Sequence, residues 1–450
     1  MCASSASASG SRAPHGGVLQ RYLRERFPGF LESRLRDGRS SFMLADVNAF
    51  LACGDIRQSN ATLRCFKCHV QRTIPLSCKR RGFCEPCAVR RQITRGWSLQ
   101  REVFGTKPVR LWTMTLPFPF RIEAGFDSGL LTKILDVVIK SLFRYVRITI
   151  KRLLKLRYMN CVYPASVTVI HRTSRHLGPN IHFHCLLVDG AFVRRADGAP
   201  LEFVDLPPPT DDQIADLSRT VCKRVRYMLW RDNVWDDLPA TNGEIAGVFV
   251  TKDGRAAKCR IAGIAAGQAA ELPRGVTAFN LRASKSVRAG DRKNQRRLIK
   301  YLLAPPFSEA QLHPTDDGMI LELPRPRSDG TTTWEYTHEE FLNCLEFTVP
   351  PQGANMIRFH GAFAPNCKFR AEAVPPPTPN GNAPTPNPDN GESPEDYAAW
   401  AVLKTHSFGK DVTKCPICQG RLQLIALTTD RMTYRRSGKP PDTPKVEVTT

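Results

Sequence analysis

The chain has 450 residues, of which 42% are hydrophobic, and a formal net charge of +23. This length allows two to four domains with a sizeable core. The excess of positive charge favours a polyanionic partner, with nucleic acid first among the candidates. An anionic membrane surface is the rival, but the sequence carries no compact amphipathic anchor, no lipidation signal and no apolar run long enough to span a bilayer.

The first 17 residues are rich in serine and alanine and lack the apolar core of a signal peptide, so we expect a disordered leader. We therefore expect a cytoplasmic protein that associates with the nucleoid by binding DNA. The chain contains 15 cysteines. In a cytosolic protein, cysteines bind metals or remain free thiols more often than they form disulfides.

Hydrophobic periodicity along the chain predicts a mixture of helices and strands. Helices are expected over residues 18–54, 130–157, 210–235 and 291–303, and strands over 109–116, 165–171 and 181–188, with short strand-like pieces in 246–264. The basic face of the helix over 130–157 is either a solvated surface or a contact to backbone phosphates. Residues 375–394 are rich in proline and asparagine and predict a disordered linker before a small tail module.

Two Cys-x-x-Cys pairs, Cys65/Cys68 and Cys84/Cys87, are separated by 15 residues. This spacing predicts one structural zinc site with four thiolate ligands. Cys78 or His69 could replace one ligand, and buried free thiols are the alternative.

Other features flank this predicted zinc site. Nearby basic residues predict contacts to DNA, namely Lys79, Arg80, Arg81, Arg90 and Arg91. A third pair, Cys415 and Cys418, has no evident partner pair in the sequence, although His406 could join it.

Three histidines predict a catalytic metal site. His182 and His184 are two residues apart on an expected strand and so point to the same face. His171, on the preceding strand, could face the same point, with His176 as a weaker alternative. Three imidazoles leave coordination positions open for a phosphate, and we expect Mg²⁺ or Mn²⁺. The alternative is a set of polar residues on the wet face of a strand.

Tyr301 is the candidate nucleophile, on a helix whose other face carries Arg296, Arg297 and Lys300 as expected DNA contacts. A phenol is a weak nucleophile at neutral pH, and nearby cations would favour its phenolate. Attack on DNA would give a phosphotyrosine and a free 3′-hydroxyl, an exchange that needs no ATP. The sequence accordingly lacks a phosphate-binding loop of the Walker type. Asp291 is expected to be the N-cap of this helix.

These segments, in this order, resemble the rolling-circle transposases of the insertion-sequence 91 family and their common-region relatives. These transposases belong to the wider HUH (histidine-hydrophobe-histidine) endonucleases. The resemblance covers residues 40–425 and is carried by the segments 65–87, 108–119, 180–192, 289–306, 358–366 and 415–420. It implies an α+β fold with an N-terminal zinc-binding module, a central antiparallel sheet with flanking helices and the histidine pair on a middle strand, and a small C-terminal module.

The resemblance also implies that the chain nicks and rejoins single-stranded transposon ends through a 5′-phosphotyrosine. Some relatives carry a second catalytic tyrosine four residues away, where this chain has Pro305 or Arg297, so it looks like the single-tyrosine version. Many relatives have glutamine where this chain has His171.

The expected organisation is a leader (1–17), a helical and zinc-binding domain (18–100), an HUH endonuclease domain (101–310), an extension (311–374), a linker (375–394) and a tail module (395–450). Two alternative functions stay open. A plasmid replication initiator or relaxase would use the same active site. A non-catalytic, zinc-dependent DNA-binding regulator would explain the charge and the cysteines, but would leave Tyr301 and the histidines without a role.

Overall fold

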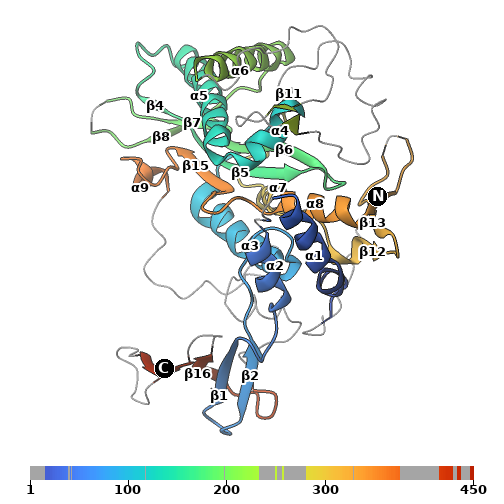
Figure 1. Cartoon of the computed structure of the whole chain (residues 1–450). Helices are drawn as coiled ribbons and strands as arrows, with labels where there is room; N and C mark the ends of the chain where they lie inside the picture. Colours follow the sequence, from blue (N-terminus) through green and yellow to red (C-terminus); the bar gives the residue numbers. More distant parts are fainter. Residues whose placement is uncertain are drawn as a thin grey trace. The chain divides into compact units, whose positions relative to one another are not determined.

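The computed structural model describes residues 16–38, 41, 43–116, 118–196, 198–232, 249–250, 256–257, 280–327, 329–374, 415–428, 433–436 and 446–449. The chain divides into two compact units, coloured along the sequence in Figure 1. The first comprises Met1–Thr94, Phe307–Glu322 and Asn382–Thr450, and the second Arg95–Pro306 and Leu323–Gly381. The expected linker, nearly all of the leader and most of the segment 246–264 lie outside the described residues.

The first unit combines helices with a sheet built from both ends of the chain. Its described elements are α1 (Val18–Arg36), α2 (Leu44–Leu51), β1 (Asn60–Cys65), β2 (Gln71–Pro75), α3 (Glu85–Ser98, which continues past the unit's boundary), the 3-10 turn η2 (Glu309–Gln311), β12 (Leu312–Pro314), β13 (Gly318–Glu322), β16 (Leu422–Thr428), β17 (Thr433–Arg436) and β18 (Val446–Thr449).

The sheet of the first unit has the strand order β18-β17-β16-β1-β2. Strand β1 pairs antiparallel with β2 and with β16, which lie on either side of it (Figure 1). Residues 415–428, expected in a separate tail module, therefore join strands from near the N-terminus. Pairing between segments so distant leaves no local pattern, so the sequence did not reveal it.

The second unit has a larger set of elements. They are the π-helix η1 (Leu99–Phe104), β3 (Val109–Thr115), α4 (Phe118–Phe126), α5 (Ser128–Leu153), β4 (Val162–Tyr163), β5 (Ala165–Thr173), β6 (Pro179–Val188), β7 (Gly190–Val193), β8 (Glu202–Asp205), α6 (Asp211–Arg231), β9 (Phe249–Val250), β10 (Ala256–Ala257), β11 (Asn280–Ala283), α7 (Arg292–Leu302), β14 (Thr333–Thr337), α8 (His338–Thr348), β15 (Ile357–Gly361) and α9 (Arg370–Ala373).

The main sheet of the second unit is antiparallel, with the strand order β11-β3-β6-β5-β15. Strand β6, which carries the histidine pair, is its middle strand. The α+β class and the central antiparallel sheet are thus confirmed. The connection between β5 and β6 is shorter than expected, because Thr173 already pairs with Pro179.

Each face of this sheet has its own core, and the two-residue period of β6 assigns its side chains to them. On one face, Phe183 and Cys185 pack into the cluster that contains the buried residues of α5 and α6. On the other face, Leu186 and Val188 pack with η1 and α7. His182 and His184 share the parity of Leu186, so they lie on the face that α7 covers.

A buried ion pair joins the strands beside this face. Arg110 Nε and Nη2 donate to the two carboxylate oxygens of Asp189 at 2.8 and 2.7 Å, and its Nη1 donates to the Ser284 carbonyl at 2.8 Å. Both charged side chains are only 6% exposed. Asp189 therefore ties the end of β6 to β3, and Arg110 ties β3 to the chain after β11.

Candidate active site and metal centres

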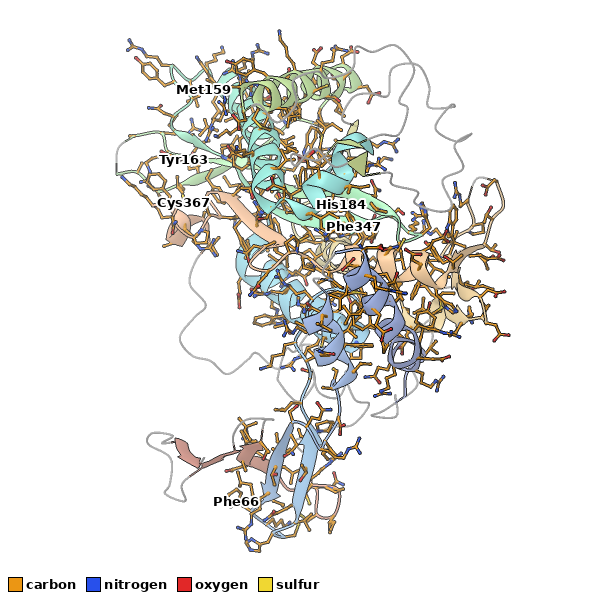
Figure 2. The ribbon with its side chains drawn as sticks, viewed as in Figure 1. Phe66, Met159, Tyr163, His184, Phe347 and Cys367 are labelled. Carbon is orange, nitrogen blue, oxygen red and sulfur yellow. The ribbon has the colours of Figure 1, made fainter. Side chains whose placement is uncertain are left out.

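Three imidazoles meet on the α7-facing side of the central sheet, and we call His171, His182 and His184 the histidine cluster. His171 on β5 lies directly opposite His182 on β6, because the two residues are register partners. The ring centroids are 5.1 Å apart for His171 and His182, 4.4 Å for His171 and His184, and 4.7 Å for His182 and His184. One ring nitrogen of each residue lies within 4.8 Å of the others. His184 is labelled in Figure 2.

Backbone carbonyls orient two of these rings. His171 Nε2 lies 2.7 Å from the Leu302 carbonyl oxygen, and His182 Nδ1 lies 2.7 Å from that of Asn180. A carbonyl only accepts, so these nitrogens carry the protons and donate. The lone pairs of the neutral rings are then on His171 Nδ1 and His182 Nε2. Such fixing of the tautomer by an outer hydrogen bond is typical of metal-binding histidines.

His184 supplies the observation that fits a cation best. Its Nδ1 lies 3.2 Å from the Thr113 hydroxyl on the neighbouring strand β3. Its Nε2 is buried and has no hydrogen-bond partner. A buried polar atom without a partner is costly unless something else binds it. A cation bound by the lone pair of Nε2 would satisfy it, so the donor set fits a metal.

Burial keeps these rings in the neutral form that binds metals. Burial, assisted by repulsion from His171, lowers the pKa of His182 to about 4 and that of His184 to about 2. Burial also lowers the pKa of His171. His176, the weaker alternative ligand, stacks on Trp334 with ring centroids 4.6 Å apart and is not part of the cluster.

Tyr301, in the last turn of α7, lies beside the histidine cluster. Its ring centroid is 5.8 Å from that of His184, and the side chain is 56% exposed. The Leu302 carbonyl that accepts from His171 belongs to the next residue of the same helix. The arrangement therefore brings an accessible phenol to the edge of a three-imidazole set.

Helix α7 is anchored by its ends and by its buried face. The Asp291 carboxylate accepts from the backbone N–H of Asn294 at 3.1 Å, so Asp291 is the N-cap, as predicted. Gln100 Nε2 of the π-helix donates to the Arg292 carbonyl at 2.8 Å. Ile299 and Leu302 are buried against the sheet. Tyr301, between these two residues, consequently points elsewhere, toward solvent and His184.

The basic residues predicted to contact DNA fall into two groups. Lys79 and Arg80 are exposed in the loop before Cys84. Arg91 Nη2 donates to their carbonyls at 3.3 and 2.8 Å, and Arg90 Nη1 donates to the Ser77 hydroxyl at 3.3 Å. These two arginines brace the loop, a role that charge alone does not reveal.

The remaining predicted DNA contacts differ in exposure. Arg81 is half-buried. On α7, Arg296 Nε donates to the Gln100 side-chain oxygen at 3.4 Å. Arg297 and Lys300 on the same helix are exposed. Of the three basic residues predicted on α7, these two are therefore the more exposed to solvent.

The cysteines gather in two four-thiol clusters in the first unit. The N-terminal cluster consists of Cys53, Cys78, Cys84 and Cys87, and the split cluster of Cys65, Cys68, Cys415 and Cys418. In the N-terminal cluster the Cys78 and Cys87 sulfurs are 3.4 Å apart, and the Cys84 and Cys53 sulfurs are 3.8 Å apart. Four sulfurs at such separations match a tetrahedral thiolate site, in which zinc–sulfur bonds are about 2.3 Å long.

The clusters correct the ligand set expected from the sequence. Cys65, Cys68, Cys84 and Cys87 do not form one site, because the first pair lies in the split cluster and the second pair in the N-terminal cluster. Cys78 belongs to the N-terminal cluster, in agreement with the alternative in which it replaces one of the expected zinc ligands. Sequence reasoning missed Cys53, which belongs to no Cys-x-x-Cys pair. His406 lies outside the described residues.

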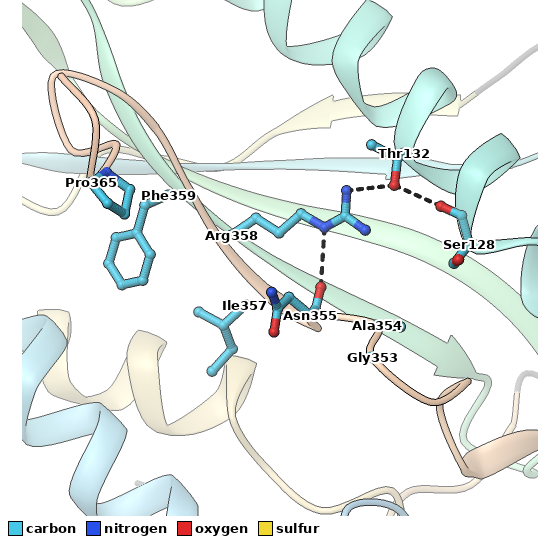
Figure 3. Close-up of a pocket in the computed structure, with 9 residues that line it drawn as sticks. All are labelled: Ser128, Thr132, Gly353, Ala354, Asn355, Ile357, Arg358, Phe359 and Pro365. Carbon is cyan, nitrogen blue, oxygen red and sulfur yellow. Dashed lines mark hydrogen bonds between the residues drawn. The ribbon is translucent and has the colours of Figure 1, made fainter.

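A separate pocket of about 460 Å³ lies between the start of α5 and the chain around β15 (Figure 3). Its central group is Arg358, whose Nη1 donates to the Thr132 hydroxyl at 2.9 Å and whose Nε donates to the Asn355 carbonyl at 3.1 Å. None of its lining residues is a histidine, a cysteine or a carboxylate. The pocket therefore offers no metal-ligand set, whereas the histidine cluster does, and the histidine cluster is the candidate active site.

Comparison with known proteins gives two matches to family models. A family described as "Putative transposase" matches residues 166–370, which include the histidine cluster and Tyr301. A family described as "Transposase zinc-binding domain" matches residues 23–116, which include six of the eight clustered cysteines but not Cys415 and Cys418. No curated protein and no solved structure matches the chain. No helix among the described residues is long and apolar enough to cross a membrane.

Proposed function

Because the chain belongs to the insertion-sequence 91 family of transposases, we propose that it nicks and rejoins single-stranded DNA at the ends of a transposable element. Tyr301 is the nucleophile, and the histidine cluster holds a divalent cation. The observation that carries the proposal is the 5.8 Å between the ring centroids of Tyr301 and His184, next to a buried His184 Nε2 without a partner.

The reaction is a transfer of phosphorus between two oxygens. The Tyr301 oxygen attacks the phosphorus, the bond to the 3′-oxygen breaks, and the products are a 5′-phosphotyrosine and a free 3′-hydroxyl. Rejoining is the reverse attack by a 3′-hydroxyl. The proton of the phenol can leave to water, because 56% of the Tyr301 side chain is exposed. Since one ester replaces another, no nucleotide cofactor is needed.

The chain's own residues orient this exchange. His171 holds the end of α7, and with it Tyr301, next to the histidine cluster, because its Nε2 donates to the Leu302 carbonyl. Arg297 and Lys300 provide positive charge on the same helix, which attracts the DNA backbone. A divalent cation would polarise the scissile phosphate and offset the charge that develops on its oxygens. The coordination positions left open by three imidazoles would be filled by phosphate and water oxygens, which suit Mg²⁺ and Mn²⁺ alike.

Zinc in the N-terminal cluster is proposed to have a structural role. Four protein thiolates leave no open coordination position, so zinc in the N-terminal cluster would stabilise the fold and not react. The loop that carries Lys79 and Arg80 lies between Cys78 and Cys84, two members of that cluster. We expect zinc to hold this loop in the shape that presents its charges to DNA.

A covalent-trapping experiment tests the nucleophile. Single-stranded oligonucleotides that cover the DNA flanking the gene are incubated with the protein and Mn²⁺, and the adduct is detected by its retarded migration in a denaturing gel. Tyr301→Phe should form no adduct while it binds the same DNA. Tyr158→Phe is the matched control, because Tyr158 is 58% exposed in the same unit. An adduct formed by Tyr301→Phe would refute the assignment.

A second pair of variants tests the histidine cluster. The double variant His182→Ala/His184→Ala should lose Mn²⁺-dependent cleavage and keep DNA binding. His176→Ala is its control, because this ring stacks on Trp334 away from the cluster. Undiminished nicking by the double variant would exclude the cluster as the site of the cation.

A further inference from the structure

We propose that the split cluster, Cys65, Cys68, Cys415 and Cys418, binds a second zinc ion that fastens the C-terminal segment to the N-terminal strands. Its two halves are 350 residues apart in the sequence. Cys415 and Cys418 lie outside both segments that match known families. The inference does not depend on the DNA chemistry proposed above.

The sulfur positions match a tetrahedral metal site. Cys65 Sγ lies 3.5 Å from Cys418 Sγ, and Cys68 Sγ lies 3.4 Å from Cys415 Sγ. All four sulfurs lie within 4.8 Å of one another. Bonds of about 2.3 Å to one central zinc ion place tetrahedral sulfurs roughly 3.8 Å apart. A disulfide would need about 2.05 Å, so the closest pairs are metal-like and not cross-linked.

The two Cys-x-x-Cys loops have the same backbone shape. The N–H of Cys65 donates to the Val70 carbonyl at 2.9 Å, and the N–H of Cys415 donates to the Gly420 carbonyl at 2.7 Å, five residues on in each case. The residue after each second cysteine has a positive φ, 59° for His69 and 56° for Gln419. Two distant segments thus adopt one ligand-presenting turn and face each other.

Backbone N–H groups also point at the first sulfur of each turn. The backbone N–H groups of Cys68 and Lys67 donate to Cys65 Sγ. Those of Cys418 and Ile417 donate to Cys415 Sγ. N–H donors at sulfur stabilise the thiolate, which is the form that binds a metal.

The surrounding structure holds the two turns together. Strands β1 and β16 pair antiparallel from Cys65↔Leu422 to Asn60↔Thr428 (Figure 1). Leu63 and Leu422 are buried in the same cluster as Cys65 and Cys415. A Cβ at Gly420 would lie 3.1 Å from Cys418 Sγ and 3.3 Å from Cys65 Sγ, so glycine allows the close approach. Phe66, at the tip of the first turn, is 58% exposed and is labelled in Figure 2.

The N-terminal cluster does not compete for these ligands. It already has four thiols of its own, all from residues 53–87. Each cluster is therefore complete without a cysteine from the other. The expected occupancy is two zinc ions per chain, one in each cluster.

Metal counting on cysteine-pair variants tests this pairing. Zinc per chain is measured by mass spectrometry of the purified full-length protein. Wild type should contain two zinc ions. Cys65→Ser/Cys68→Ser, Cys415→Ser/Cys418→Ser and Cys84→Ser/Cys87→Ser should each contain one.

Combined variants then separate the possible groupings. Loss of Cys65, Cys68, Cys415 and Cys418 together should still leave one zinc ion, because both pairs belong to one site. Loss of Cys415 and Cys418 together with Cys84 and Cys87 should leave none. Cys367→Ser is the control, because Cys367 belongs to neither cluster. An unchanged zinc count in Cys415→Ser/Cys418→Ser would overturn the proposal.

A measurement on the wild type covers the case in which a variant does not fold. The protein is stripped of zinc and refilled with Co²⁺, whose visible absorption reports tetrahedral thiolate coordination. We expect saturation at two such sites per chain, and saturation at one would overturn the proposal. Neither readout involves DNA, so failure here and failure of the nuclease proposal are distinguishable.

Discussion

Replacing Thr113 by valine tests whether its hydroxyl holds His184 in the tautomer that can bind a cation. The substitution keeps the β-branched shape of the side chain and removes the hydroxyl that lies 3.2 Å from His184 Nδ1. In the wild type this hydroxyl can accept from Nδ1–H, which leaves the lone pair on the buried Nε2. In the variant nothing holds the proton on Nδ1, so the ring loses its preference for the metal-binding tautomer.

The size of the effect follows from the hydrogen bond. A bond between neutral groups contributes about 1 kcal/mol, and about 1.4 kcal/mol corresponds to a factor of ten in a binding constant. Removing the partner of a metal-bound histidine lowers metal affinity by roughly 10–100-fold. The distance of 3.2 Å is at the long end of the normal range for a hydrogen bond. We therefore expect Thr113→Val to weaken Mn²⁺ binding about tenfold, which is the lower limit of that 10–100-fold range.

Electron paramagnetic resonance measures the free Mn²⁺ during a titration of the protein without DNA. Thr168→Val is the matched control, because the Thr168 hydroxyl donates to Cys185 Sγ at 3.5 Å on the opposite face of the sheet. This control should bind Mn²⁺ as the wild type does. Unchanged affinity in Thr113→Val, or an equal loss in the control, would refute the reasoning.

Further predictions concern pH and stability in chelator-treated protein. Burial lowers the pKa of His182 to about 4 and that of His184 to about 2, so the unfolded chain takes up protons first as the pH falls below 6.5. Urea unfolding should show that the second unit loses stability from pH 6.5 downward, by about 3 kcal/mol from His182 alone at pH 4; a flat profile would contradict this. Asp189→Ala leaves the buried Arg110 charge without its carboxylate partner and should cost about 3–5 kcal/mol in the same assay. Asp216→Ala, which breaks an exposed ion pair on α6, should cost less than about 1 kcal/mol, and equal losses would contradict the burial argument.

Local periodicity was enough to predict much of the fold around the candidate site. The two-residue period of a strand places His182 and His184 on one face, and a hairpin brings His171 opposite them. The helix that carries Tyr301 was predicted from its spacing and from its N-cap Asp291. These features depend on neighbours in the sequence, which is why a single sequence contains them.

Features that depend on distant partners could not be predicted in the same way. The spacing between Cys68 and Cys84 is compatible with one shared zinc site, and only the pairing of β1 with β16 shows that Cys415 and Cys418 join Cys65 and Cys68 in a different thiol cluster. The role of Thr113 likewise arises from the register of β3 against β6. Charge alone also could not show that Arg91 holds a loop.

Identification of the residue that becomes linked to DNA is the most direct test of the proposed chemistry. The trapped protein–DNA complex is digested with a protease and a nuclease, and the modified peptide is sequenced by tandem mass spectrometry. The account predicts a single nucleotide 5′-phosphate attached to the oxygen of Tyr301. Attachment to another residue, or cleavage that leaves no covalent product, would contradict it.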